Sequence, residues 1–134
     1  MKAKIALVLI LIISVMETMA QNKIKRKELS SFDIKKREVS IVKVVEIEFP
    51  AGQKAPLHRH PCPVIGIIVE GQCLVQVEGE PAIILKVGEA FFEPAGIPIV
   101  HFDNYSETEP MKFTAYYLTN GEDELIEMLH TKQK

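Results

Sequence analysis

The stretch that decides the fold is Leu57-His-Arg-His-Pro-Cys-Pro-Val-Ile-Gly-Ile-Ile-Val-Glu-Gly71, which places two histidines at the start of a strongly apolar run. Side chains on a strand alternate between its two faces, so His58 and His60 point to the same face if this segment is extended. Their Cα atoms then lie roughly 6.5 Å apart, and both imidazoles can reach one metal ion at about 2.1 Å. A third histidine, His101, follows in a later apolar segment. These three histidines are the candidate metal ligands.

Turn residues recur at short intervals on both sides of this stretch, and the segments between them are rich in Val, Ile and Phe. The predicted strands span residues 39–49, 57–60, 64–69, 73–77, 82–87, 90–93, 100–103 and 111–119. Many short strands with frequent turns and no βαβ spacing are typical of a β-sandwich or a small β-barrel. The expected fold class is therefore all-β, with residues 38–119 forming a barrel.

The segment from Val64 to Val77 is predicted to form a hairpin with its turn at Glu70-Gly71. That turn places Cys73 opposite Ile68, and Cys62 then lies several residues further along. A disulfide requires Cα atoms within about 7 Å, so a Cys62–Cys73 bond is disfavoured unless the chain bends away from the wall.

Alternation within this segment also predicts which side chains point inward. The expected inner face carries Val64, Gly66, Ile68, Cys73, Val75 and Val77, and the opposite face carries Ile65, Ile67, Val69 and Leu74. A strand that is apolar on both faces has to be covered twice, by the tail, by the first strand or by a second protomer. We therefore expect a homodimer.

The two ends of the chain differ from the barrel. Residues 1–20 resemble a signal peptide, with an apolar core too short for the roughly twenty residues of a spanning helix and a cleavage site after Ala20. Residues 21–37 form a basic arm, within which residues 29–34 are either a helical turn or an extended edge segment. Residues 120–134 follow a break at Asn120-Gly121, and their acidic start and spaced apolar residues predict a short amphipathic helix.

Composition excludes some partners. The chain has 134 residues with 16 basic and 18 acidic side chains, and removal of residues 1–20 leaves it slightly acidic. A nucleic-acid-binding protein needs a basic face, so no nucleic-acid partner is expected. With the signal peptide removed no membrane anchor remains, and we expect an exported protein, periplasmic or secreted.

Two motifs now resemble those of the cupins. Gly52, His58-x-His60 and Gly71 resemble the first cupin motif, and a second set follows in the order Gly88, Pro94-x-Gly96, His101 and Asn104. The resemblance covers about residues 38–119. It implies a small jelly-roll β-barrel, often dimeric, with a central pocket for a ligand or a metal.

The chain departs from the cupin motifs at two positions. The first motif usually carries a metal-binding Glu where this chain has Val64, and the second usually carries a His where this chain has Ile99. His101 comes two residues later. Either the shift of two keeps His101 on the inner face, or a longer turn restores it to the usual position.

Other chemically active residues near the motifs have simpler interpretations. Cys62 shares a face with the histidines and is a soft-metal ligand in principle, but its flanking prolines favour a buried, inert thiol. Glu93 can act as an acid or base at the barrel mouth, although a solvated carboxylate is the favoured interpretation. One of Tyr116 and Tyr117 should face the pocket, and His130 is expected at the surface.

The function predicted from these residues is binding of a divalent transition metal, Zn, Fe, Ni or Cu, through His58, His60 and His101, together with a small molecule in an apolar barrel. Two alternatives remain open. One is a metal-dependent dioxygenase or isomerase acting on a small apolar or phenolic substrate, with catalytic residues unknown. The other is a metal-free periplasmic binding module.

Overall fold

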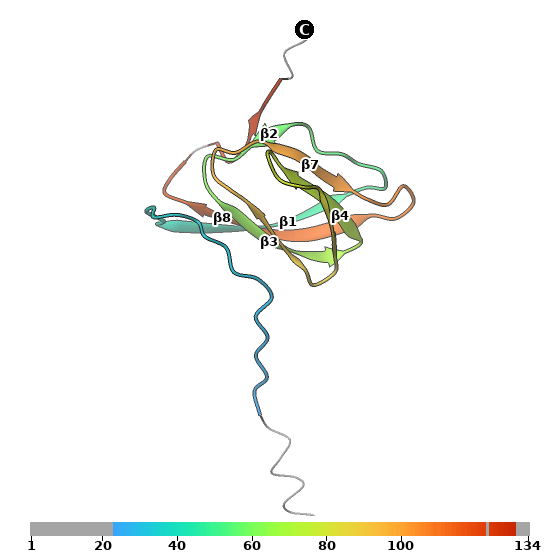
Figure 1. The fold of residues 1–134 in the computed structure, drawn as a ribbon, viewed down its shortest axis with the longest axis horizontal. Coiled ribbons are helices and arrows are strands. Elements are labelled where there is room, and N and C mark those ends of the chain that lie inside the picture. The colour runs from blue at the N-terminus through green and yellow to red at the C-terminus, as the bar shows by residue number, and fades with distance from the viewer. Residues whose placement is uncertain (1–22, 123, 131–134) are drawn as a thin grey trace, which may run out of the picture.

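The computed structural model describes residues 23–122 and 124–130, which form nine strands and no helix. The strands are β1 Ile41–Phe49, β2 His58–Arg59, β3 Val64–Glu70, β4 Gln72–Val77, β5 Ile83–Lys86, β6 Ala90–Glu93, β7 Ile99–Asn104, β8 Met111–Thr119 and β9 Glu127–Met128. They make two antiparallel sheets, ordered β1-β8-β3-β6 and β5-β4-β7-β2-β9 (Figure 1). The all-β prediction is confirmed, and all eight predicted strands are present. Within this part of the chain, no helix is long and apolar enough to cross a membrane.

The turn at Glu70-Gly71 connects the two sheets and does not close a hairpin. β3 pairs with β6 and β8, whereas β4 pairs with β5 and β7. Gly71 has a φ of 76°, and a Cβ there would lie 2.7 Å from the Pro110 carbonyl oxygen, so the crossing requires glycine. The predicted pairing of Cys73 with Ile68 is therefore wrong. Strand alternation predicts facing correctly, but it does not predict which strands pair.

The core lies between the two sheets. The six predicted inner residues of β3 and β4 are all buried, as the alternation predicted. Phe91, Phe102 and Phe113 pack edge-on or tilted against one another, with ring centroids 4.8 to 5.6 Å apart. A Cβ at Gly66 would lie 2.2 Å from the Phe91 ring, so this glycine makes room for the aromatic cluster.

Both cysteines are free thiols inside the protein. Cys62 and Cys73 have no exposed surface, and burial raises the pKa of each thiol above its ordinary value. The disfavoured Cys62–Cys73 disulfide is not formed.

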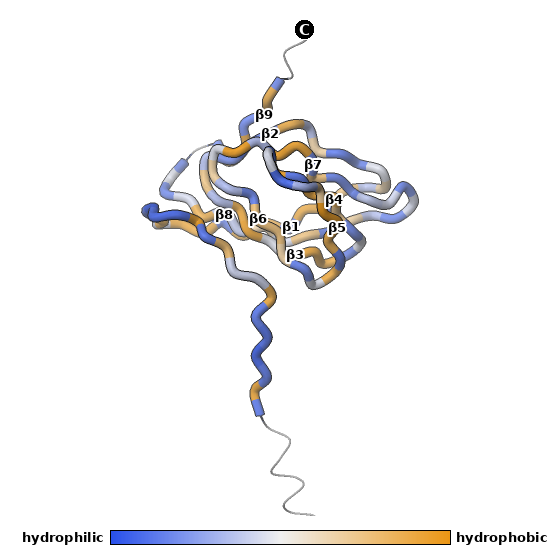
Figure 2. The backbone as a smooth tube through the Cα atoms, in the orientation of Figure 1, coloured by the Kyte–Doolittle hydropathy of each residue, from blue (hydrophilic) through white to orange (hydrophobic). Residues whose placement is uncertain are grey.

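The described part of the N-terminal arm has no helix and bends near Lys35, whose φ is 60°, so the helical alternative for residues 29–34 is wrong. It leaves the barrel on the side remote from β2, and Figure 2 shows that it is mainly hydrophilic while apolar residues concentrate on the strands. Phe32 anchors it by stacking on Phe92, with ring centroids 5.1 Å apart. The predicted signal peptide, residues 1–20, lies outside the described residues.

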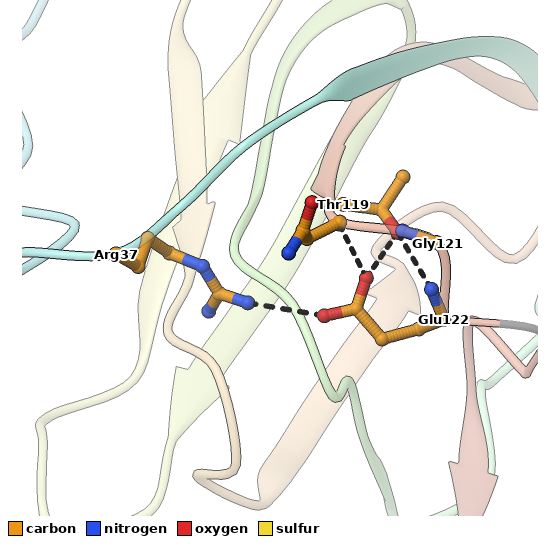
Figure 3. Close-up of polar contacts among 5 residues, drawn as sticks. Arg37, Thr119, Gly121 and Glu122 are labelled. Atoms are coloured by element: carbon orange, nitrogen blue, oxygen red, sulfur yellow. Dashed lines mark hydrogen bonds and ion pairs between the residues drawn. The ribbon is translucent and has the colours of Figure 1, made fainter.

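The arm also contacts the chain just after β8. The Arg37 guanidinium lies 3.2 Å from Oε1 of Glu122, and the Thr119 hydroxyl donates to the other carboxylate oxygen (Figure 3). The Thr119 hydroxyl, the backbone amides and Arg37 lower the pKa of Glu122 to about 2. This contact joins the two ends of the domain.

The predicted C-terminal helix is wrong for the described part of residues 120–134. Glu127–Met128 form β9, which pairs with β2, and the Leu129 amide donates to the Leu57 carbonyl at 2.9 Å. An isolated helix this short is marginal in water. The edge of β2 instead offers backbone partners, so the segment adds a strand to the sheet.

Candidate metal centre

Two histidines lie side by side at one end of the barrel. His58 is in β2 and His60 follows it, and both are buried, with 4% and 3% of their surface exposed. Their ring centroids are 5.1 Å apart. The sequence prediction that the pair shares one inward face is confirmed.

A carboxylate completes the cluster from another strand. Glu93, at the end of β6, is 4% exposed and places its two oxygens 3.8 Å from His58 Nε2 and 3.1 Å from His60 Nε2. The favoured interpretation of Glu93 as a solvated carboxylate is therefore wrong. The three side chains form a group whose ligand atoms all lie within 4.8 Å of one another.

Strand pairing explains why Glu93 points inward. Glu93 is directly opposite Val64 in the β3–β6 pair, and opposed residues in an antiparallel pair present their side chains to the same face. Val64 occupies the position where the resemblance expects an acidic ligand. The carboxylate is thus supplied by the neighbouring strand. One sequence signal could have found it: Glu93 has the same strand parity as the apolar Phe91.

The outer nitrogens of both rings are already bonded to backbone carbonyls. His58 Nδ1 lies 2.6 Å from the Pro56 oxygen, and His60 Nδ1 lies 2.5 Å from the Leu125 oxygen. A carbonyl only accepts, so each Nδ1 carries a proton and each ring turns its Nε2 toward Glu93; when the ring is neutral, that Nε2 presents a lone pair. Two imidazole lone pairs and a carboxylate then converge in a buried site without a proton donor. Such a donor set needs a cation between its members, either a proton or a metal ion.

The proton equilibria of the cluster agree with this geometry. Burial lowers the pKa of His58, but the hydrogen bonds to Glu93 and Pro56 and the Glu93 charge outweigh it, so the net shift is upward. Burial raises the pKa of Glu93, but the two histidines outweigh it, so that pKa lies below its usual value. The cluster therefore favours a positive charge beside the carboxylate.

His101 is not brought to this cluster. Gln76 pairs with His101 and Val77 pairs with Ile99, so β7 carries one extra residue at this point. This β-bulge reverses the facing of the strand. The side chain of His101 is 44% exposed, and its Nδ1 lies 2.9 Å from Oδ2 of Asp103. Neither sequence alternative for His101 anticipated the bulge.

Ile99 takes the inner position instead. It is 1% exposed and lies directly opposite His58 in the pairing of β2 with β7. The position where the resemblance expects a third histidine is therefore filled by an aliphatic side chain, which leaves one side of the cluster without a ligand.

Of the other candidate residues named from the sequence, one tyrosine lies beside the site and the rest do not join it. Tyr117 is half-buried with its ring centroid 5.6 Å from that of His60, while Tyr116 is exposed, so the prediction that one tyrosine faces the site is confirmed. Cys62 is buried and does not join the group of three ligands. His130 is exposed, as predicted.

A cavity of about 140 Å³ adjoins the cluster. His60 and Glu93 line it together with a mainly apolar wall made of Ile47, Phe49, Val64, Phe102, Phe113, Ala115, Tyr117 and Ile126. Among the residues that the structure describes, no lysine or arginine lines it. Its mainly apolar lining suits the apolar body of a very small molecule.

Comparisons with known proteins agree with this architecture. Residues 45–117 match the Cupin domain family. No curated protein matches the chain in sequence. Similar solved structures include the DMSP lyase DddQ from Ruegeria pomeroyi, at 22% identity and a TM-score of 0.59. A cupin-like protein from Thermotoga maritima has 25% identity and a TM-score of 0.57, and oxalate oxidase in complex with glycolate has 24% and 0.55.

The similar structures match part of this chain and part of their own length. The aligned part covers 69% of this chain and 45% of the lyase, 69% of this chain and 68% of the Thermotoga protein, and 66% of this chain and 46% of oxalate oxidase. The chain thus spans less than half the length of the two enzymes. The family match covers more than half of the chain. The chain therefore belongs to the cupin domain family.

Proposed function

We propose that this chain is a metal-binding cupin in which His58, His60 and Glu93 hold one divalent transition-metal ion. The observation that carries the proposal is the convergence of three lone-pair donors, with both histidine tautomers set by backbone carbonyls. Two ligand atoms each about 2.1 Å from one ion lie roughly 3 to 3.5 Å apart, close to the His60–Glu93 separation. The donor set fits a metal without requiring His101.

The identity of the ligands indicates which metal ions fit the site. Two imidazoles and one carboxylate suit Fe(II), Zn(II), Ni(II) and Cu(II), and three protein ligands leave coordination positions open. A bound ion would supply Lewis acidity and open positions for a small molecule. The three protein ligands would fix the position of the ion, and the apolar wall of the cavity would limit the access of water on the side of His60 and Glu93.

We infer that the partner is a small molecule with an apolar body and one metal-binding oxygen. Apart from His60 and Glu93, the described residues that line the cavity are apolar or aromatic. The hydroxyl of Tyr117 stays protonated at neutral pH, because burial raises its pKa, and it can donate a hydrogen bond to such an oxygen.

An enzymatic role is the second candidate. Two histidines and one carboxylate with open positions are the ligand set of non-haem iron oxygenases, which favours a dioxygenase or an isomerase on an apolar or phenolic substrate. Two of the similar structures are a lyase and an oxidase, which supports chemistry in this barrel. A metal-free binding module is the remaining alternative, and metal analysis separates it from both.

We also propose that the protein is exported and acts as a homodimer. The apolar pattern of residues 1–20 supports export. Val42, Val44 and Tyr116 are exposed on the outer face of the sheet formed by β1, β8, β3 and β6, and this supports a second copy as the cover.

The test is metal analysis of the purified protein and four variants. We expect about one metal per chain in the parent, little in His60→Ala and Glu93→Gln, and parental amounts in His101→Ala and His130→Ala. Circular dichroism confirms that each variant folds. Absence of metal from the parent, after dialysis against each candidate metal, would overturn the proposal. Loss of metal only in His101→Ala would show that the ligand set is different.

A further inference from the structure

The segment after β8 reaches back to the two histidines. Residues 124–130, termed here the C-terminal strap, contribute the Leu125 carbonyl that accepts from His60 Nδ1 at 2.5 Å. Through this bond the strap determines the tautomer of a proposed metal ligand. A carbonyl acting on a ligating histidine in this way orients the ring and raises its basicity.

The strap is held to β2 by a strand pairing only two residues long, His58 with Met128 and Arg59 with Glu127, and by a few further bonds. The Leu129 amide donates to the Leu57 carbonyl at 2.9 Å, and the Arg59 guanidinium makes two hydrogen bonds with Glu127, at 2.8 and 2.9 Å. Met128 is 50% exposed, and the Arg59 and Glu127 side chains are also largely exposed. Exposed ion pairs contribute only about 0 to 1 kcal/mol, and the strand pairing is only two residues long, so the strap can open more easily than the longer strands of the barrel.

One strap residue separates the inside of the barrel from the outside. Ile126 lines the 140 Å³ cavity beside His60 and Glu93, and it also lines an open groove of about 540 Å³. The groove is otherwise bounded by Pro61, Glu122, Glu124 and Glu127. Displacement of Ile126 would therefore join the cavity to the groove and give a small molecule a route to the site.

We propose that the C-terminal strap is a gate coupled to metal binding. With the strap closed, Leu125 orients His60 for the metal and Ile126 shuts the cavity; with the strap open, the cavity is accessible and His60 loses its orienting partner. This inference rests on the proposed metal site. Because coupling between two equilibria is reciprocal, a bound metal must also hold the strap closed.

The first measurement uses the full chain without mutation. Hydrogen–deuterium exchange of residues 124–130 is followed with Zn²⁺ and with EDTA. We expect Zn²⁺ to slow exchange in the strap, in addition to any slowing at the ligands themselves. If Zn²⁺ binds and the strap exchanges at the same rate as without it, the proposal is overturned.

The second measurement weakens the strap at one bond. Leu129→Pro removes the amide that donates to Leu57, and His130→Pro places the same residue one position further on, at an exposed site beyond β9. We expect Leu129→Pro to weaken Zn²⁺ affinity by about tenfold or more, the range seen for lost outer partners of metal ligands. It should also speed the release of Co²⁺ to EDTA, followed by the loss of visible absorption. His130→Pro should retain parental values for both.

The outcomes separate the gate from the site. A parent that binds no Zn²⁺ refutes the metal site itself. A parent that binds Zn²⁺, with unchanged affinity and release in Leu129→Pro, refutes only the gate. If Leu129→Pro does not fold, the exchange of residues 124–130 in the unmutated chain, with Zn²⁺ and with EDTA, decides the gate.

Discussion

At the scale of single residues, the site depends on one carboxylate reached through an unexpected position. Val64 and Glu93 are opposite one another on adjacent strands and point to the same face. Opposed Cβ atoms in an antiparallel pair are roughly 5 Å apart, within the reach of a glutamate side chain. The chemistry of the site is therefore set by which of the two positions carries the acid.

Because positions 64 and 93 face each other, a carboxylate introduced at position 64 should be able to replace the one at position 93. We expect Glu93→Val to weaken Zn²⁺ binding at least about tenfold, because it removes one of three ligands. The double variant with Val64→Glu and Glu93→Val should recover part of that loss. Isothermal titration calorimetry with Zn²⁺ measures both. A double variant no better than Glu93→Val would show that position 64 does not face the histidines.

The same cluster predicts an unusual dependence of stability on pH. Since the folded-state pKa of His58 is raised, its stabilising contribution is fully present below its unfolded pKa, about 6.5, and is lost as the pH rises through the folded value. We expect the metal-free protein to become less stable as the pH rises above about 6.5, with Zn²⁺ cancelling the decline. Urea unfolding with EDTA or with Zn²⁺ measures this. A His58→Gln variant should lose the dependence.

At the scale of elements, a single extra residue in β7 decides which side chain reaches the site. The bulge between the Gln76 and Val77 pairings directs His101 outward beside Asp103 and leaves Ile99 opposite His58. Bulges re-aim side chains at sites of this kind. The inner position of β7 opposite His58 is therefore occupied by the aliphatic side chain of Ile99 and not by a histidine.

A histidine at position 99 should restore a fourth ligand. We expect Ile99→His to bind Zn²⁺ more tightly than the parent, because its imidazole would start directly opposite His58. The metal-free variant should be less stable by about 1.5 to 3 kcal/mol, since a buried isoleucine is lost. Calorimetry and urea unfolding measure the two effects. His101→Ala is the control and should alter metal affinity little.

At the scale of the whole molecule, the outer face of the sheet formed by β1, β8, β3 and β6 is apolar and only partly covered by the described part of the chain. Phe32 of the arm covers the β6 end of the outer face of the sheet formed by β1, β8, β3 and β6. At the β1 end, Val42 and Val44 are 52% and 60% exposed. Contiguous exposed apolar residues of this kind mark interaction surfaces.

We expect the protein to sediment as a dimer and Val44→Glu to shift it toward monomer, because a charge in an apolar contact is costly to desolvate. Ile84→Glu, at an exposed apolar position of the other sheet, is the matched control and should remain dimeric. Sedimentation velocity distinguishes the two states. A parent that is monomeric at high concentration would refute the proposed dimer.

Local pattern was enough to predict much of this protein. Alternation and turn residues identify all eight strands of the barrel, and they place His58, His60 and Val64 on inner faces. Strand position and the facing of each side chain depend only on residues close together in the sequence, because strand side chains alternate with a period of two. The cupin motifs, read from the same segments, predict the family that the match to residues 45–117 confirms.

The tertiary structure alone decided which segments meet. The Glu70-Gly71 turn crosses between sheets, Glu93 arrives beside Val64, the β7 bulge turns His101 away, and the C-terminal segment becomes a strand against β2. Each of these is a long-range pairing whose free energy depends on partners far apart in sequence, and one inserted residue reverses a face. The sequence by itself therefore determined the strands and the histidine pair, while strand pairing brought Glu93 to that pair and the C-terminal segment to β2.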